Sequence, residues 1–299
     1  MRLVWLLLLT ACPRQSAPPA TVGGDRAFPG PCKVSYDDDG DTRVDREVVT
    51  TYDALGRPSS IEERDGKGDL TGRFANAYDP AGHLVSERSF DGTGKMLTEW
   101  ASIFDNAGRL LRRHVAKSSD GTAGQRRSFT YDAEGRVLVE EIDVPGTGVT
   151  ERRETTYDAA GRRASFKIDR EGDATDESRT FTYDGAGHEI ERQVSKGGSP
   201  SQTVKTSWDA GGHKVLEEVL DSIGRLEHRI RYRYDGGGHV IEEKWEDTGG
   251  TPIVTLTSTW DARGNLLRTT RDGDWSGGEP DGNFDERVDY DYACWSPGT

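Results

Sequence analysis

The chain has 299 residues and a formal net charge of −14 at pH 7. This acidic balance argues against nucleic acid or an anionic membrane surface as a partner, because both are themselves negatively charged. Leu, Ile, Val and Phe make up roughly 18% of the residues, a share that by itself is typical of disordered proteins. The chain also carries a repeat that stays in register over most of its length, which is not expected of a disordered protein. We therefore predict a folded sheet with a small core.

The first twelve residues, MRLVWLLLLTAC, resemble a bacterial lipoprotein signal. A basic residue precedes an apolar run that is too short to span a bilayer, and the run ends in the lipobox-like Leu9-Thr10-Ala11-Cys12. The resemblance implies that residues 1–11 are removed and that Cys12 carries a lipid. This would place the protein in the cell envelope, at the outer membrane or cell surface rather than the inner membrane. An ordinary signal peptide or a misplaced start codon is the alternative.

Residues 12–31 are rich in Pro, Gly and Ala, so we expect a disordered tether. The tether leads into a repeat domain that we place at residues 32–294. Residues 295–299 then form a C-terminal tail.

An octapeptide such as TYDAEGRV at 130–137 occurs nine times, with its aromatic residues 25 to 27 residues apart. An aromatic residue is followed by Asp, two variable residues and Gly. The Asp side chain can accept a hydrogen bond from the backbone two residues on, and the Gly supplies the positive φ that a bulged three-residue hairpin loop requires. We therefore interpret these residues as structural turns and not as catalytic groups. The pairs are Asp53 and Gly56, Asp79 and Gly82, Asp105 and Gly108, Asp132 and Gly135, Asp158 and Gly161, Asp184 and Gly187, Asp209 and Gly212, Asp235 and Gly238, and Asp261 and Gly264.

A weaker second turn, such as DGTG at 91–94, lies between successive octapeptides. Each unit of about 26 residues thus holds two turns and two strands, and consecutive hairpins form an antiparallel meander. Positions three and seven after the turn Gly, such as Leu138 and Ile142, are mostly apolar and share one face of a strand. The sequence predicts an all-β protein: tandem hairpin repeats in one long antiparallel sheet of about 20 strands, curled or rolled.

The segment GRLEHRIRYRYDGGGHV at 224–240 resembles the YD repeat of the Rhs family, with its Gly, Arg-Tyr-x-Tyr-Asp and second Gly at the typical spacing. The resemblance covers residues 50–271 and implies a spiral β-sheet shell, which in large family members encapsulates a C-terminal toxin. Only about 35 residues follow the last turn and no autocleavage motif is present, so we expect no toxin domain. Small secreted proteins with such repeats act in adhesion or as scaffolds, which is the class implied here.

Two acidic loops interrupt the repeat, DDDGDTRVD at 37–45 and DGNFDERVD at 281–289. Their oxygen-bearing side chains stand at positions 1, 3, 5 and 9, a spacing that can converge on a hard cation such as calcium. Both loops lack the Gly at position 6 and the Glu at position 12 of calcium loops, and a polar turn with an Asx cap is the alternative. The candidate calcium-binding residues are Asp37, Asp39, Asp41, Asp45, Asp281, Asn283, Asp285 and Asp289.

Four of the six histidines directly follow a turn Gly, at a place where other repeats have Arg. Because Arg has no lone pair to donate to a metal, we interpret this position as part of a surface ladder. The sequence has no Ser-His-Asp order, phosphate loop or CxxC motif. Neighbouring acidic residues such as Glu140 and Glu141 point to opposite faces of a strand and cannot act as a glycosidase pair, although residues from different strands could.

The hypothesis that follows is a non-enzymatic, lipid-anchored envelope protein whose repeat sheet binds or scaffolds a glycan or protein partner. One alternative is a glycan-acting hydrolase with carboxylates from different strands. The other is an accessory shell of an Rhs-type secretion system without a toxin domain. Calcium is the one cofactor that the sequence suggests.

Cys32 and Cys294 remain once Cys12 is lipidated, one in the first expected strand and one in the last. The envelope is oxidising, which favours a disulfide between them. Twenty strands laid flat at about 4.8 Å each would separate the ends by roughly 90 Å. A bridge within one chain therefore requires a closed sheet. Two free thiols on an open ribbon, or a bridge between chains, are the alternatives.

An even number of strands makes the first and last strands antiparallel. We expect Tyr36 to face Tyr290 and Val34 to face Tyr292 across this join. That register would set the two cysteines opposite each other.

Overall fold

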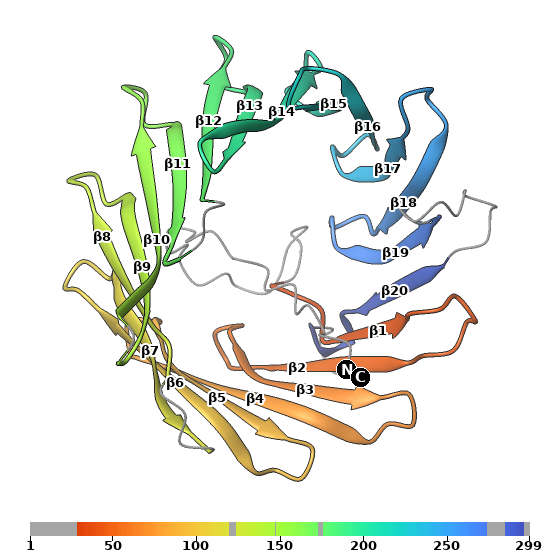
Figure 1. The fold of residues 1–299 in the computed structure, drawn as a ribbon. Helices are drawn as coiled ribbons and strands as arrows, with labels where there is room; N and C mark the ends of the chain where they lie inside the picture. The colour runs from red at the N-terminus through yellow and green to blue at the C-terminus, as the bar shows by residue number, and fades with distance from the viewer. Residues whose placement is uncertain (1–28, 120–123, 147, 173–175, 274–284, 296–299) are drawn as a thin grey trace.

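The computed structural model describes residues 29–119, 124–146, 148–172, 176–273 and 285–295 (Figure 1). The predicted signal peptide, most of the predicted tether and the predicted lipidation site Cys12 lie outside the described residues. The candidate calcium ligands Asp281 and Asn283 lie outside them as well.

The described residues form twenty strands and one short 3-10 helix, Ala293–Trp295. The strands are β1 (Lys33–Asp37), β2 (Arg46–Tyr52), β3 (Pro58–Asp65), β4 (Leu70–Tyr78), β5 (Leu84–Asp91), β6 (Met96–Phe104), β7 (Leu110–Ser118), β8 (Arg126–Tyr131), β9 (Val137–Val144), β10 (Gly148–Tyr157), β11 (Arg163–Arg170), β12 (Glu177–Tyr183), β13 (Glu189–Lys196), β14 (Ser199–Trp208), β15 (Lys214–Asp221), β16 (Leu226–Tyr234), β17 (Val240–Glu246), β18 (Pro252–Trp260), β19 (Leu266–Asp272) and β20 (Glu286–Asp291). No helix in this part of the chain is long and apolar enough to cross a membrane.

Every strand pairs antiparallel with the next one along the chain, and β20 pairs with β1. The sheet therefore closes on itself, as the ring of strands in Figure 1 shows. Twenty strands about 4.8 Å apart correspond to a ring roughly 30 Å across between backbones, before strand tilt widens it. The predicted all-β architecture is confirmed, in its closed form.

The hairpin turns follow from local chemistry. In the turn after β10, the Gly161 N–H donates to the Asp158 carbonyl at 2.9 Å, and the Asp158 N–H donates to the Arg162 carbonyl at 2.8 Å. The ladder register shifts between Thr156 and Tyr157, which is the bulge that accompanies such a turn. All nine turn glycines have φ between 72° and 95°, in the left-handed region where a Cβ is disfavoured.

The seam of the barrel is the join between β1 and β20. The predicted register there is wrong by two residues, because Val34 faces Tyr290 and Tyr36 faces Val288. Strand β20 ends at Asp291, whose carbonyl accepts the Cys32 N–H at 2.7 Å, and the chain then turns into the 3-10 helix. The helix brings Cys294 back beside Cys32, where the two form a disulfide with their Cα atoms 5.9 Å apart.

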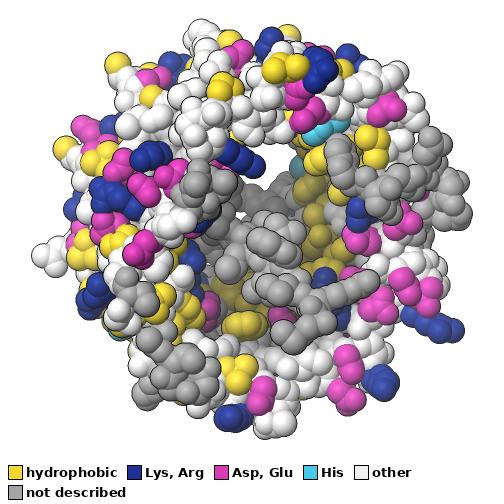
Figure 2. Space-filling view, viewed as in Figure 1, with side chains coloured by type: hydrophobic (Ala, Val, Ile, Leu, Met, Phe, Trp, Pro, Cys, Tyr) yellow, Lys and Arg dark blue, Asp and Glu magenta, His cyan; other side chains and the backbone are white. Residues whose placement is uncertain are grey.

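The core is thin and lies on one face of the sheet. The buried aliphatic residues are Val34, Ile142, Ile168, Val204, Val219, Ile230 and Val254. The strand registers place all of them on the same face, with direct partners such as Val204 and Val219. A closed sheet crowds the side chains on its concave side, so this face lines the interior. Figure 2 shows hydrophobic side chains on the wall of the central opening.

Candidate functional sites on the turns, the interior wall and the seam

Each turn Asp holds its own loop closed. Asp158 Oδ1 accepts the N–H groups of Ala160 at 2.9 Å and Arg162 at 2.8 Å, and its Oδ2 lies 2.8 Å from Arg162 Nε. The backbone hydrogen bond from Arg162 leads the causes that hold the pKa of Asp158 below its ordinary value. The carboxylate is fully engaged in the turn, which is a structural role.

The residue after the turn Gly reaches the next repeat. The Arg162 guanidinium lies 4.6 Å from the centre of the Tyr183 ring, and the His188 ring stacks on Trp208 with centroids 4.8 Å apart. His188 Nδ1 also lies 3.0 Å from Asp184 Oδ2, just as Arg162 Nε lies 2.8 Å from Asp158 Oδ2 in the preceding turn. The same stacking recurs at Arg57, His83, Arg109, Arg136, His213 and His239. Arg and His are thus equivalent at this position, because either side chain packs against the aromatic ring of the next repeat.

In most octapeptides the aromatic residue makes a hydrogen bond to the preceding hairpin. The Tyr183 hydroxyl donates to the Arg163 carbonyl at 2.8 Å, and Trp208 Nε1 donates to the Glu189 carbonyl at 2.9 Å. Both acceptors stand two residues after the turn Gly of the preceding repeat. Sequence reasoning missed this bond, although a signal was available: eight of the nine aromatic residues are Tyr or Trp, which carry a donor, and Phe104 is the exception.

A polar pocket of about 270 Å³ lies on the interior wall between β12, β13 and β14. Its lining consists of Glu177, Arg179, Arg192, Val194, Lys196, Ser201 and Gln202. Arg179 Nη2 lies 2.5 Å from Glu177 Oε1, and Glu177 stands opposite Lys196 in the ladder. The lining itself carries three basic side chains and one carboxylate, and Arg192 Nη1 also lies 3.4 Å from Oε1 of Glu189, which is outside the lining.

A second polar group on this face surrounds Tyr232. Its hydroxyl donates to Glu217 Oε2 at 2.7 Å, and Lys214 Nζ lies 3.0 Å from the same oxygen. Burial, followed by the bond to Glu217, raises the pKa of Tyr232 far above its ordinary value. The phenol therefore stays protonated at neutral pH.

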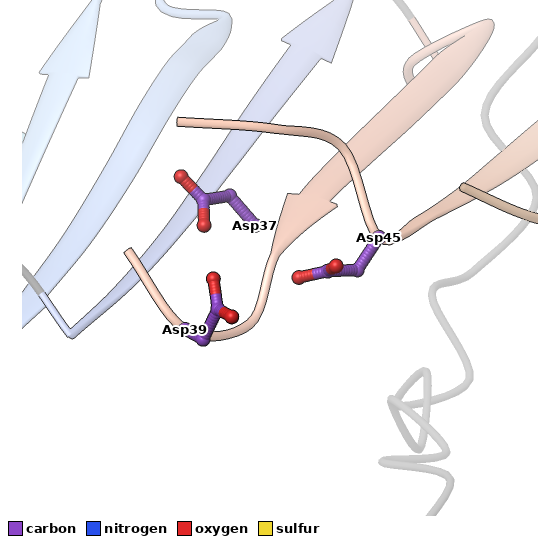
Figure 3. Close-up of side chains that lie close together, drawn as sticks. All are labelled: Asp37, Asp39 and Asp45. Carbon is purple, nitrogen blue, oxygen red and sulfur yellow. The ribbon is translucent and has the colours of Figure 1, made fainter. Parts of the chain in front are cut away.

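Three of the four candidate calcium ligands of the first acidic loop lie together (Figure 3). One carboxylate oxygen each from Asp37, Asp39 and Asp45 lies within 4.8 Å of the other two. Asp41 is outside the group, since its Oδ1 accepts the Arg43 N–H at 2.8 Å.

The second acidic loop is described only from Asp285 onward. Asp289 stands in β20, where its Oδ1 lies 2.5 Å from Arg268 Nε and its Oδ2 lies 2.7 Å from Arg287 Nη2. Asp289 thus forms ion pairs with two arginines.

A scan of known families finds no match to the chain, and neither does a search of characterised proteins. Among solved structures, the chain resembles TcdB2-TccC3-TEV at 14% identity and a TM-score of 0.36, over 80% of this chain and 15% of that one. It resembles TcdB2-TccC3 at 15% identity and a TM-score of 0.31, over 85% and 17%. A porin-like protein from Bacteroides uniformis is 9% identical with a TM-score of 0.38, over 74% and 97%. The chain spans less than a fifth of the length of the first two, and these likenesses concern the fold alone.

Proposed function

We propose that the protein is a non-enzymatic, lipid-anchored envelope protein whose closed barrel binds an acidic glycan on its interior wall. The observation that carries this proposal is the pocket between β12, β13 and β14, where Arg179, Arg192 and Lys196 face one space with a single carboxylate. Guanidinium groups bind carboxylates, and they make charge-assisted hydrogen bonds in a fixed fork geometry.

The remaining lining fits the same class of ligand. Gln202 and Ser201 can each donate and accept hydrogen bonds, as sugar hydroxyls require, and Val194 offers an apolar surface to a sugar ring. The volume of about 270 Å³ is at the lower end for small-molecule sites. A sugar unit therefore fits this pocket better than a folded protein segment does.

The binding test uses the purified mature protein on an array that includes uronic and sialic acid glycans. The double variant Arg192→Ala/Gln202→Ala should lose at least tenfold in affinity. The control Arg231→Ala removes a guanidinium from the opposite face of the sheet, where it pairs with Glu246 at 2.9 Å, and should bind like the wild type. An array without any bound glycan, or equal binding by the double variant, would refute the proposal. Release of new reducing ends would favour the hydrolase alternative instead.

The anchor is supported by the lipobox-like sequence ending in Cys12. Mass spectrometry of the membrane fraction should find a mature chain that begins with a lipidated Cys12. An intact residue 1, or a soluble secreted form that begins elsewhere, would contradict this part of the proposal.

A further inference from the structure

The three carboxylates at the seam come from three different places in the local fold. Asp37 is the last residue of β1, Asp39 lies in the following loop, and Asp45 directly precedes β2. Figure 3 shows the side chains pointing toward one another. Three carboxylate groups this close together repel one another unless a cation lies between them.

Asp37 supplies an independent sign of a missing partner. Its side chain is 5% exposed, and its Oδ2 accepts the Thr42 N–H at 2.9 Å. Its Oδ1 is buried and has no hydrogen-bond partner among the described residues. Leaving a buried carboxylate oxygen unpaired is costly, so an oxygen in this position is a ready metal ligand.

The nearby arginines pair with other carboxylates, although Arg287, which stands opposite Asp37 in the ladder, has an Nε without a hydrogen-bond partner among the described residues. Arg43 lies 3.8 Å from Asp41, Arg46 lies 3.3 Å from Asp38, and Arg287 lies 2.7 Å from Asp289. Within the part of the chain that the structure describes, none of these cations forms an ion pair with the three clustered carboxylates. The negative charge of the three clustered carboxylates is therefore available to a bound cation.

We propose that Asp37, Asp39 and Asp45 bind one calcium ion. A ligand set made only of oxygens selects a hard cation, and calcium tolerates an irregular mixture of carboxylates, carbonyls and water. The three residues occupy positions 1, 3 and 9 of the loop. At position 6, where calcium loops have Gly, Thr42 adopts a φ of 73°.

The ion fastens β1 to β2, and β1 is the strand that forms the seam with β20. Strand β1 has only five residues, and it closes the ring between β20 and β2. The Cys32–Cys294 disulfide holds the sheet just before the start of β1, and Asp37 is its last residue. Calcium at Asp37 thus connects the far end of β1 to the start of β2, so each end of the seam strand has its own fastening.

Titration calorimetry of the oxidised mature protein with calcium chloride, in metal-free buffer, tests the site. We expect one site with a dissociation constant of about 0.1–1 mM, as in extracellular calcium modules. Asp39→Asn should weaken binding at least tenfold, because this exposed residue is a ligand. Asp41→Asn removes the same charge from the same loop outside the group, and should weaken binding less than threefold. No heat in the wild type, an equal loss in both variants, or equal binding of magnesium would overturn the proposal.

Hydrogen exchange then tests the role of the seam. Calcium should slow exchange at the amides of β1 and β2 at least threefold in the wild type and not in Asp39→Asn. Amides of β10 and β11, across the barrel, should be unaffected and serve as the internal control. Calcium binding without protection of β1 would overturn the fastening role.

Discussion

The repeats between β2 and β19 and the seam between β20 and β1 are joined by different chemistry. In the repeats, the same aromatic, Asp and Arg or His side chains link every hairpin to the next one. At the seam, Trp295 Nε1 donates to the Gly30 carbonyl at 2.8 Å, the Trp295 ring lies 4.7 Å from that of Tyr52, and a disulfide crosses the join. The Trp295 hydrogen bond is of the same kind as those of Trp208 and Trp260, whereas the disulfide has no counterpart elsewhere in the described residues.

The difference shows what a repeat can and cannot do. A repeated hairpin extends a sheet indefinitely, but it leaves an open strand edge at each end. Closure here uses groups outside the repeat, such as Cys32 and Cys294. In the last turn, Asn265 takes the place of Arg or His, is 2% exposed, and donates from Nδ2 to Asp261 Oδ2 at 2.7 Å.

Of the changes that test this difference, removal of the disulfide should lower the unfolding free energy most. The bond closes a loop with a sequence separation of 262 residues, so chain entropy predicts a loss of about 5 kcal/mol in unfolding free energy. The double variant Cys32→Ser/Cys294→Ser should therefore unfold at a lower urea concentration than the oxidised wild type. The reduced wild type is the control and should unfold at the same urea concentration as the variant. Unchanged stability would mean that the ladder alone holds the seam.

A turn in the repeats should be less costly to break. Gly161 has a φ of 81°, which a β-branched residue resists, so Gly161→Val should cost about 1–2 kcal/mol in unfolding free energy. Ala160→Ser in the same turn should change it by less than about 0.5 kcal/mol. Equal shifts in melting temperature for the two variants would contradict the assigned turn.

The bond between successive hairpins can be both removed and added. Tyr131 donates to the Leu110 carbonyl at 2.6 Å, and Tyr131→Phe should cost about 1 kcal/mol in unfolding free energy. Phe104 occupies the equivalent position without a donor, so Phe104→Tyr should gain about 0.5–1 kcal/mol by reaching the Leu84 carbonyl. Chemical denaturation measures both, and a loss of stability in Phe104→Tyr would show that this repeat is spaced differently.

The turn carboxylates should have the smallest individual effects, because solvent screens them. Their pKa values all lie below the ordinary value of 3.8 in the folded protein, at Asp53, Asp79, Asp105, Asp132, Asp158, Asp184, Asp209, Asp235 and Asp261. Between the folded and unfolded pKa values, the unfolded chain binds more protons. The stabilisation is therefore complete well above pH 3.8 and is lost as the pH falls below it.

Melting curves between pH 6 and pH 2 measure this loss. Asp158→Asn removes one titrating carboxylate. The melting temperature of this variant should therefore fall slightly less on acidification than that of the wild type. A melting temperature that rises as the pH falls below 3.8 would contradict the sign.

Local features of this barrel could be predicted from the sequence. The Asp and Gly of each octapeptide interact within four residues, so the turns, the bulges and the strand number follow from neighbours along the chain. Closure was one of the alternatives that the sequence left open, because a closed sheet is required only if Cys32 and Cys294 form a bridge within one chain, as they do in the structure. The acidic spacing of the first loop pointed to four candidate ligands.

Other features depended on the tertiary structure. The two-residue difference in seam register follows from where β20 ends, at Asp291, and the sequence does not mark that end. The hydrogen bond from Tyr183 to the Arg163 carbonyl spans 20 residues and requires neighbouring hairpins to be in their final register. Likewise, Asp37, Asp39 and Asp45 share one space while Asp41 does not, because the path of the loop between β1 and β2 sets the direction of each side chain. The sequence by itself determined the contacts that form within a few residues, whereas those that join distant strands were decided only when the barrel closed.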